Sequence, residues 1–285
     1  MRKNQSSLTA AGIAIARAVE SEKPAGERIC YDPYARLLVP NWMFRFFGLF
    51  IKSGYAERRG PGVNGFLVAR DRYIDDVLQC FLEDGLQQLV ILGAGYDSRP
   101  YRFDLRGQVK TFEVDHPATQ EDKLRKLQSI FGKLPAQVTY VSIDFNTQTL
   151  AGRLSQSGFD PALKTLFIWQ GVSMYLTAKA VDSTLSFVVN HSLPGSAIVF
   201  DYIYQDVLAG VQRHSEVSGM RRYRFMTGEG LTFGIPEGAG EAFLKARGFR
   251  QVKDANVAYL RAAYFRGKNA GRKVADGYGI VIGVV

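Results

Sequence analysis

The sequence predicts a doubly wound α/β fold, in which a parallel sheet binds a nucleotide at the carboxyl ends of its strands. The apolar run Gln88–Leu92 has the composition of a strand buried on both faces, and it ends at the turn Gly93-Ala94-Gly95. A second such run, Val109–Asp115, ends in an acidic residue. Asp115 lies about 20 residues beyond Gly95, where a ribose-binding carboxylate is expected in nucleotide-binding α/β folds.

The glycine turn favours an adenosine ligand that lacks a pyrophosphate. Glycines at positions 93 and 95 let the backbone turn tightly and approach a ligand closely. The dinucleotide-binding pattern has a third glycine that brings the helix close to the strand over a pyrophosphate, and Ser98 stands at that position here. This difference argues against NAD and FAD. The alternative is that Gly93 and Gly95 only serve a strand-to-loop turn.

Length and composition indicate a globular cytoplasmic protein. A chain of 285 residues is normal for one α/β domain with additions, and its 46% hydrophobic content supports a large core. Cys30 and Cys80 have no metal-binding spacing and offer no disulfide framework, so a reducing compartment is expected. The polar N-terminus lacks the apolar segment of a signal peptide, and no run reaches the roughly 20 apolar residues that span a bilayer.

The net charge of +9 raises the question of a nucleic-acid partner. The basic residues form short clusters at Arg58-Arg59, at Arg221-Arg222 with Arg224, and between Arg261 and Lys273. None of these clusters has the alternation with aromatic residues that a recognised DNA- or RNA-binding motif shows. An acidic small substrate, or solubility alone, explains the charge as well, so we expect a small-molecule partner rather than a nucleic acid.

Mostly helical sequence precedes the first strand. Apolar residues recur at helical spacing over Thr9–Glu20, with Thr9 as a candidate N-cap. Asp32 is placed to cap a helix that begins at Pro33. A long amphipathic helix is expected from about Asn64 to Leu82. These helices are more than a bare nucleotide-binding fold needs, and we expect them to form a cap over the site.

The block Trp42–Ile51, which Asn41 is placed to cap, is unusually aromatic. Such a helix lies either on a membrane surface or against the protein as a lid or core helix. The block has one basic residue, Arg45, and no strongly charged face. This pattern favours the lid or core helix.

The remainder of the chain alternates strand and helix patterns and then ends in two strands. The loop Gly267–Gly271 is short enough to join those last two strands as an antiparallel hairpin. Thr177 is placed to cap the helix that begins at Ala178, and Gly248 is placed to end the helix that begins at Glu237. The expected helices are 118–129, 178–190 and 237–247, and the expected strands are 137–144, 164–171, 196–201, 257–266 and 278–285.

Several motifs along nearly the whole chain resemble one family of proteins. The most specific are Leu92-Gly93-Ala94-Gly95-Tyr96-Asp97-Ser98-Arg99 and Phe112-Glu113-Val114-Asp115-His116-Pro117. Supporting matches are Thr9-Ala10-x-Gly12, Arg17-Ala18-x-Glu20, Asp32-Pro33-Tyr34-Ala35, Ala69-Arg70-Asp71-Arg72-Tyr73-Ile74-Asp75-Asp76, Gln170-Gly171-Val172-Ser173-Met174-Tyr175-Leu176 and Gly277-Tyr278-Gly279. Together they resemble the leucine carboxyl methyltransferase family of S-adenosylmethionine-dependent enzymes, in particular its bacterial O-methyltransferase branch.

The resemblance implies the class I methyltransferase (Rossmann-like) fold: a seven-stranded sheet with the last strand antiparallel, under an N-terminal helical cap. We therefore expect a single methyltransferase domain over residues 1–285, with the cap at 1–85 and the core at 86–285. Carried over by motif, Gly93 and Gly95 would lie against the methionine part of S-adenosylmethionine. Asp115 would accept hydrogen bonds from the ribose hydroxyls, since one carboxylate can serve both groups of a diol.

The resemblance implies four further cofactor contacts. Asp144 would accept from the adenine amino group, with Phe145 beside the ring, and Arg70 would pair with the cofactor carboxylate. The family often has Glu where this chain has Gln170, near the positively charged sulfonium. Loss of that anion would weaken the attraction, but an amide oxygen still accepts hydrogen bonds, so cofactor binding should survive.

The chain offers no well-placed histidine as a general base. His116 is expected to shape the loop after Asp115, and His191 and His214 are expected at the surface. A carboxylate acceptor is ionised at neutral pH and needs no base, whereas a hydroxyl acceptor does. The histidines therefore favour carboxylate methylation without excluding other oxygens, and the catalytic residues stay unassigned.

Two tyrosines and one basic cluster are candidate acceptor contacts. Tyr175 and Tyr202 follow the fourth and fifth expected strands, where open α/β sheets place ligand-contacting residues, and either could instead pack in the core. Arg221-Arg222-Tyr223-Arg224 could receive an anionic acceptor, although a solvated loop is the commoner role of such a run.

The sequence thus predicts an S-adenosylmethionine-dependent O-methyltransferase that acts on the carboxylate of a small, acidic molecule, with no metal. Two alternatives remain open. One is an RNA methyltransferase, which the charge suggests, and the other is a non-catalytic protein that binds an adenosine ligand. The oligomeric state is not indicated by any of these patterns.

Overall fold

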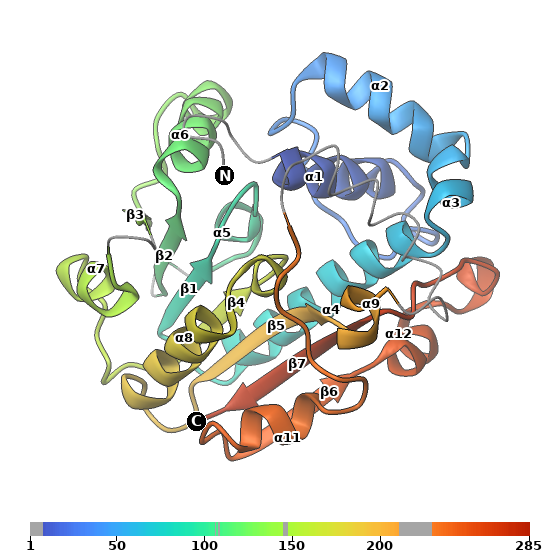
Figure 1. Cartoon of the computed structure of the whole chain (residues 1–285). Coiled ribbons are helices and arrows are strands. Elements are labelled where there is room, and N and C mark those ends of the chain that lie inside the picture. Colours follow the sequence, from blue (N-terminus) through green and yellow to red (C-terminus); the bar gives the residue numbers. More distant parts are fainter. Residues whose placement is uncertain (1–7, 106, 108, 145–147, 211–229) are drawn as a thin grey trace.

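The computed structural model describes residues 8–105, 107, 109–144, 148–210 and 230–285 (Figure 1). In this part of the chain the strands form a seven-stranded sheet in the order β3-β2-β1-β4-β5-β7-β6. The strands are β1 (Gln88–Leu92), β2 (Lys110–Asp115), β3 (Val138–Ser142), β4 (Thr165–Trp169), β5 (Ala197–Ile203), β6 (Gln251–Ala255) and β7 (Tyr278–Val284). The sheet confirms the predicted strand number and the antiparallel last strand.

Helices precede the sheet and connect its strands. No helix of the described ranges is both long and apolar enough to cross a membrane. The helices are α1 (Leu8–Ser21), α2 (Asn41–Lys52), α3 (Tyr55–Arg59), α4 (Val63–Glu83), α5 (Arg99–Arg102), α6 (Pro117–Phe131), α7 (Leu150–Gln156), α8 (Ala178–Asn190), α9 (Gln205–Leu208), α11 (Gly240–Lys245) and α12 (Val257–Tyr264), with short 3₁₀ turns η1 (Ser173–Tyr175) and η2 (Gly267–Asn269).

The direction and register of the strands bring the glycine turn and Asp115 to the same edge of the sheet. Strands β3, β2, β1, β4 and β5 run parallel, while β7 is antiparallel to both β5 and β6. The chain winds to opposite sides of β1, so a crevice is expected at the carboxyl ends of β1 and β4. Because Leu92 pairs with Val114, the glycine turn after β1 comes to lie beside Asp115 at the end of β2.

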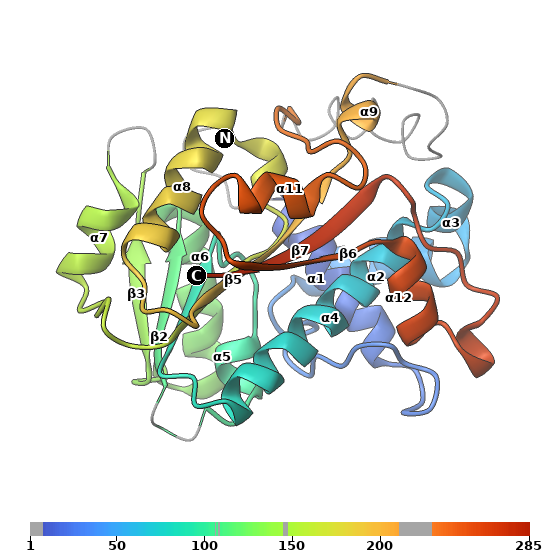
Figure 2. The same ribbon diagram turned by 90° about the horizontal axis from the view of Figure 1, so that it is seen from below.

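Alternate residues of the central strands face two separate cores. Val90 and Leu92 pack in the cluster that contains residues of α7, α8 and α11. Leu89 and Ile91 pack in the opposite cluster, with residues of α4 and α12. Figure 2 shows α8 and α11 on one side of the sheet and α4 and α12 on the other. The continuous apolar character of β1 reflects this burial on both faces.

A third core joins the N-terminal helices to the sheet. Ala14 and Val19 of α1 pack with Met43 and Phe44 of α2, and Tyr96 after β1 belongs to the same cluster. In Figure 1, α1 therefore lies between α2 and the sheet. The helix predicted over Thr9–Glu20 is confirmed as α1.

The structure corrects the predicted strand at 257–266, which is helix α12 and the loop after it. The Asn256 side chain accepts a hydrogen bond from Tyr259 N and caps this helix, and Leu260 is its buried residue. The strand that pairs with β7 is β6, earlier in the chain, so the final antiparallel pair is joined through α12 and η2 rather than by a tight hairpin. The segment contains Leu260, Arg261 and three alanines, which favour a helix, and Asn256 caps its start.

The predicted helix at Pro33 is also wrong. Residues 33–38 form consecutive turns. Asp32 still acts as a cap, because its Oδ1 accepts from Tyr34 N and Ala35 N, at 3.0 and 2.9 Å. Its Oδ2 accepts instead from Arg17 of α1, so tertiary contacts hold this carboxylate in place.

The start of α4 packs directly on the C-terminal segment. Ala275 N donates to Gly62 O at 2.9 Å. A Cβ on Gly65 would lie 2.0 Å from the backbone oxygen of Lys273, so only glycine allows this contact. A Cβ on Gly12 of α1, by contrast, would have no heavy atom within 4 Å.

We expect Gly65→Ala to lower the free energy of unfolding by about 1–3 kcal/mol, because the new methyl group must displace backbone rather than a mobile side chain. Gly12→Ala is the matched control and should raise it by about 0.5–1 kcal/mol through lower chain entropy. Urea unfolding followed by circular dichroism measures both. A Gly65→Ala protein as stable as the unmodified chain would contradict the close packing of α4 on residues 273–275.

Candidate active site

The glycine turn and Asp115 meet at the carboxyl ends of β1 and β2. Gly93 and Gly95 have φ angles of 65° and 43°, in the left-handed region that glycine adopts without strain. Gly95 N donates to Asp115 Oδ2 at 2.5 Å, and His116 N donates to Asp115 Oδ1 at 2.6 Å. The two predicted elements are therefore in direct contact.

The glycine turn is enclosed from two sides. A Cβ on Gly93 would come within 2.4 Å of Cγ2 of Val172, in the loop after β4. A Cβ on Gly95 would come within 3.2 Å of the Cβ of Ala10 in α1. Close approach to protein therefore accounts for part of the requirement for glycine at both positions.

Burial raises the pKa of Asp115, and the hydrogen bonds from Gly95 N and His116 N oppose that shift. The residue is only partly buried. Each carboxylate oxygen has two lone pairs, and each uses one on a backbone donor. Asp115 thus keeps acceptor capacity for hydroxyl groups of a ligand.

Arg70 and Asp201 form a buried ion pair beside this turn. Arg70 Nη1 of α4 donates to Asp201 Oδ2 of β5 at 2.6 Å, and the two side chains are 2% and 0% exposed. Asp201 Oδ1 accepts from Gly171 N at 2.5 Å, so the carboxylate also fixes the loop after β4. Arg70 Nε and Nη2 are buried and have no hydrogen-bond partner among the described residues. Nη2 lies 4.0 Å from Asp71 Oδ2, beyond hydrogen-bond distance. Because buried donors without a hydrogen bond are uncommon in native proteins, these two nitrogens are candidates for contact with a ligand.

Arg99 is surrounded by acceptors. Its guanidinium lies 2.5 Å from Asp97, 2.8 Å from Asp75 and 3.4 Å from Asp71. Gln170 Oε1 accepts from Arg99 Nη1 at 2.9 Å. Glutamate at position 170 would be a further carboxylate on the same cation, whereas the amide supplies an acceptor without charge. The structure therefore gives Gln170 a protein partner that the sequence did not indicate.

Arg17 of α1 connects the N-terminal helices to the site. Its Nη2 donates to Tyr96 O at 2.5 Å, and its Nε donates to Asp32 at 2.9 Å. The contact with Tyr96 places α1 against the loop that follows the glycine turn. Arg17, Asp97 and Asp201 were not predicted as site residues, although Arg17 and Asp97 lie inside the quoted motifs.

Among the remaining predicted site residues, Asp144 lies close to Asp115, because the N of the preceding residue, Ile143, donates to Asp115 O at 2.9 Å. Asp144 follows β3, and its backbone N donates to Gln148 Oε1 at 3.0 Å. Tyr175 is partly buried in η1 and packs on the core. Phe145 lies outside the described residues, as do the Arg221–Arg224 cluster and His214.

Tyr202 is a core residue. Its side chain is fully buried, and its hydroxyl donates to Asp254 of β6, with oxygen separations of 2.8 and 3.0 Å. The ring crosses β7 at Gly279, where a Cβ would lie 2.5 Å from the ring. We therefore leave Tyr202 out of the proposed acceptor site.

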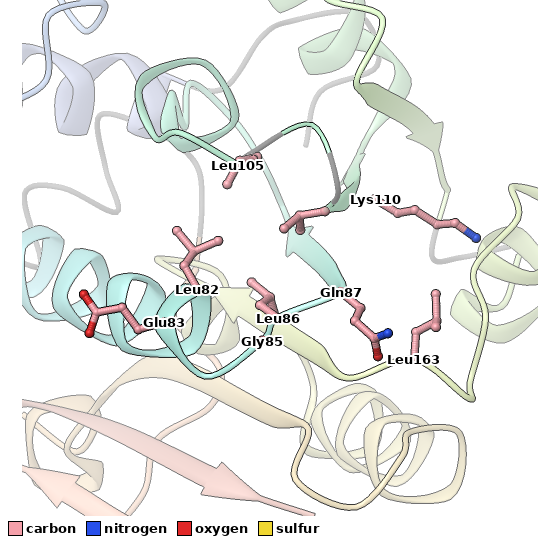
Figure 3. Close-up of a pocket in the computed structure, with 9 residues that line it drawn as sticks. Leu82, Glu83, Gly85, Leu86, Gln87, Leu105, Lys110 and Leu163 are labelled. Carbon is pink, nitrogen blue, oxygen red and sulfur yellow. The ribbon is translucent and has the colours of Figure 1, made fainter.

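A hollow of about 370 Å³ lies at the opposite end of the sheet (Figure 3). Leu86 and Gln87 before β1 line it, with Leu105, Lys110 and Leu163. Parallel α/β sheets bind ligands at the carboxyl ends of their strands, and this hollow is at the amino ends. In the described ranges, no group of three or more His, Cys, Asp or Glu side chains is arranged to hold a metal ion.

Comparison with known proteins identifies relatives over most of the chain. The model of the family described as leucine carboxyl methyltransferase matches residues 10–189. A Bacillus subtilis protein named YktD, a proposed S-adenosyl-L-methionine-dependent methyltransferase, is 32% identical over 80% of this chain and 81% of its own. A proposed methyltransferase of the same kind from Mycolicibacterium smegmatis is 32% identical over 70% of this chain and 68% of its own.

Solved structures share the fold at low identity. A DUF574 family protein from Streptomyces avermitilis has a TM-score of 0.59 at 13% identity, covering 99% of this chain and 98% of its own. A proposed methyltransferase from Thermobifida fusca has a TM-score of 0.58 at 14% identity, covering 99% and 96%. At these identities the likeness establishes the fold alone.

The charged residues around Asp97 make the free energy of unfolding depend on pH. Burial disfavours the Asp97 carboxylate, but the cations Arg99, Arg17 and Lys123 outweigh burial and lower the pKa of Asp97 to about 2. A lowered pKa in the folded state stabilises the protein above the unfolded pKa of about 4, and this contribution is lost as the pH falls towards 2. We expect Asp97→Asn to lower the free energy of unfolding by about 2 kcal/mol at pH 7 and to lose this deficit between about pH 5 and pH 2.

Urea titrations at several pH values measure the effect. The matched control is Asp182→Asn, because Asp182 forms a surface ion pair with Arg247 and its side chain is 51% exposed. This control should change stability by less than about 1 kcal/mol at every pH. An Asp97→Asn deficit that is constant from pH 7 to pH 2 would exclude the charge network as its cause.

Proposed function

Because the chain belongs to the leucine carboxyl methyltransferase family, we propose that it transfers a methyl group from S-adenosylmethionine to a carboxylate oxygen of a small molecule. The family assignment makes the chain an S-adenosylmethionine-dependent methyltransferase. Its acceptor and the reacting oxygen are the proposed part.

The observation that supports the cofactor position is the pair of buried Arg70 nitrogens that lack a hydrogen bond, one of which lies 4.0 Å from Asp71 Oδ2. Nε and Nη2 of this buried guanidinium have no hydrogen-bond partner among the described residues. Both nitrogens belong to a planar cation that matches a carboxylate in geometry and charge. The amino-acid part of S-adenosylmethionine ends in such a carboxylate, so Arg70 fits its role.

The Asp115 carboxylate is suited to accept hydrogen bonds from the ribose hydroxyls. Its oxygens are held by backbone donors and retain lone pairs for the two hydroxyls of a diol. In our proposal Asp144 and Phe145 contact the adenine, and Gly93 and Gly95 lie along the methionine part. The helices before β1 then act as the cap of the site, since α1 contacts the glycine turn through Ala10.

Methyl transfer to a carboxylate needs little acid–base chemistry. When bound, the cofactor supplies a methyl group that is already activated on a positive sulfur. The protein must hold the acceptor oxygen in line with that methyl group, and such positioning can lower the barrier by roughly 7–11 kcal/mol. A carboxylate acceptor is ionised at neutral pH, so no proton has to be removed.

The described histidines fit a reaction without a general base. His116 Nδ1 accepts from Ala118 N and caps α6. The His191 ring stacks on Phe187 at the end of α8, with ring centroids 4.9 Å apart. Both rings thus serve local structure. This supports a carboxylate over a hydroxyl acceptor, and the positive net charge of +9 favours an anionic one.

We expect the unmodified protein to bind S-adenosylhomocysteine at least about tenfold more tightly than 5′-deoxy-5′-methylthioadenosine, which lacks the amino-acid part. The double variant Arg70→Met/Asp201→Asn removes both charges of the buried pair. It should lose about ten- to hundredfold in affinity for S-adenosylhomocysteine and about threefold or less for the shorter ligand, because only the carboxylate contact is lost. Isothermal titration measures all four affinities.

Asp115→Asn provides the complementary test of the adenosine half. It should weaken both ligands by a similar factor, about tenfold, since both contain the ribose. Thermal melting without ligand verifies that each variant is folded. Equal losses for the two ligands in Arg70→Met/Asp201→Asn would exclude Arg70 as the carboxylate partner, and no binding of either ligand by the unmodified protein would exclude the cofactor site.

The product distinguishes the acceptor classes. With S-adenosylmethionine labelled in the methyl group and a panel of small carboxylic acids, we expect a labelled product that releases methanol in mild alkali, because methyl esters hydrolyse there and methyl ethers do not. A stable label on a hydroxyl compound would contradict the carboxylate assignment. Transfer to RNA that ribonuclease releases would support a nucleic-acid substrate, and cofactor binding without transfer to any acceptor would support a non-catalytic protein.

A further inference from the structure

We propose that α2 and α3 form a docking surface for an anionic lipid bilayer. The outward side chains Trp42, Phe46, Leu49 and Phe47 of α2 are 67%, 55%, 65% and 38% exposed, and Tyr55 of α3 is 38% exposed. We call these five residues the α2–α3 face. In Figure 1 these two helices lie at the outside of the molecule, on the side of α1 away from the sheet.

The core does not account for these side chains. Only Met43, Phe44 and Gly48 of α2 are buried, and they face α1, where a Cβ on Gly48 would meet Val19 at 3.5 Å. A helix that only packed on α1 would carry polar residues on its other side. The outer side of α2 instead carries large apolar residues, and a contiguous exposed patch of this kind marks an interaction site.

The exposed rings form a continuous surface across both helices. Phe46 lies 5.2 Å from Phe47 and 4.8 Å from Phe50, measured between ring centroids. The ring centroids of Phe50 in α2 and Tyr55 in α3 are 5.2 Å apart, so the aromatic contacts continue from α2 to α3. Neighbouring aromatic rings at the end of a helix are well suited to the boundary between lipid headgroups and acyl chains, where Trp and Tyr are enriched.

Basic residues accompany this face. Arg45 and Lys52 of α2 and Arg58 and Arg59 of α3 are all exposed, and Lys52 forms an ion pair with Glu22. Arg45 and Arg58 form no ion pair with a carboxylate in the described ranges of the chain. The one acid within these two helices, Glu57, accepts a hydrogen bond from Gly62 N. The structure thus adds to α2 the basic residues of α3, which the sequence of α2 alone does not contain.

Charge decides between a bilayer and a second copy of the chain. If two copies met through the α2–α3 face, Arg45, Arg58 and Arg59 of each would face one another and repel. An anionic bilayer accepts the same basic residues favourably and buries the aromatic residues at its interface. The bilayer is therefore the occupant that satisfies both features of the surface.

The docked bilayer would lie close to the candidate active site. Helix α1 has α2 on one side, and on the other side Ile13 lies against Gly171, with 3.4 Å between its Cδ1 and the Cβ position of the glycine. Helices α2 and α1 therefore lie between the α2–α3 face and the loop after β4, and the axes of packed helices are about 8–10 Å apart. Docking does not require methyl transfer, and it can be tested without a cofactor.

Vesicle co-sedimentation tests the proposal. We expect the full chain to bind large vesicles of phosphatidylcholine with about 30% phosphatidylglycerol, to bind pure phosphatidylcholine much less, and to be released by high salt. Phe46→Gln/Leu49→Gln should reduce binding about tenfold by removing apolar contact. Arg45→Glu/Arg58→Glu should reduce it by about tenfold or more, since each basic residue near an anionic surface contributes about a fivefold factor.

Matched controls separate the face from general hydrophobicity and net charge. Leu134→Gln/Leu193→Gln removes two exposed leucines elsewhere, and Lys179→Glu/Arg250→Glu makes the same charge change at other exposed positions. Both should bind vesicles like the unmodified chain. All variants should keep the affinity for S-adenosylhomocysteine and the melting temperature, which distinguishes loss of docking from loss of the fold or of the cofactor site.

Three results would overturn the proposal. The first is no binding of anionic vesicles at low salt by the unmodified chain. The second is an equal loss of binding in a control and in its matched variant. The third is a dimer in sedimentation velocity that Phe46→Gln/Leu49→Gln dissociates while vesicles remain unbound, which would assign the α2–α3 face to a second copy.

Discussion

Buried guanidinium groups connect segments of this protein that lie far apart in the sequence. Arg17, Arg70 and Arg99 are almost completely buried, and an unpaired charge in such a position would cost several kcal/mol. Each therefore has carboxylate partners, and those partners come from different elements. The pair Arg70–Asp201 joins α4 to β5 across 131 residues of sequence. The ion pairs of Arg17 and Arg70 thus act together with the apolar contacts between α1 and α2 in positioning the helices before the sheet.

The same ion pairs and hydrogen bonds orient two groups of the candidate site. Asp201 engages one end of the Arg70 guanidinium and Gly171 N, and the other two nitrogens of that guanidinium have no hydrogen-bond partner in the described part of the chain. Asp115 is likewise held by Gly95 N while keeping acceptor capacity. Both groups are oriented by the protein before a ligand arrives. Such preorganisation favours binding, because little side-chain entropy remains to be lost.

Helix α1 links the candidate site to the outer surface. Arg17 places it against the loop after the glycine turn, and its apolar residues hold α2 on the opposite side. A contact made by α2 with a membrane would therefore act on the element that encloses the glycine turn. Helix α2 carries apolar residues on the side that faces α1 and also on its outer side. Packing on α1 explains the first set, and the proposed membrane contact explains the second.

The strands β1 to β5 and β7, the glycine turn and the acid at the end of β2 could be predicted from the sequence, because apolar runs and the backbone conformation at Gly93 and Gly95 are local properties. The helix at 257–264 was not predicted, although its alanines, Leu260 and Arg261 favour a helix and Asn256 caps it. Only the tertiary structure decided that Tyr202 is a core residue bound to Asp254, that Arg99 binds Gln170, and that the outer side of α2 is exposed. The physical reason is distance along the chain: ion pairs and burial depend on residues far apart in sequence, and no local pattern specifies which of them meet.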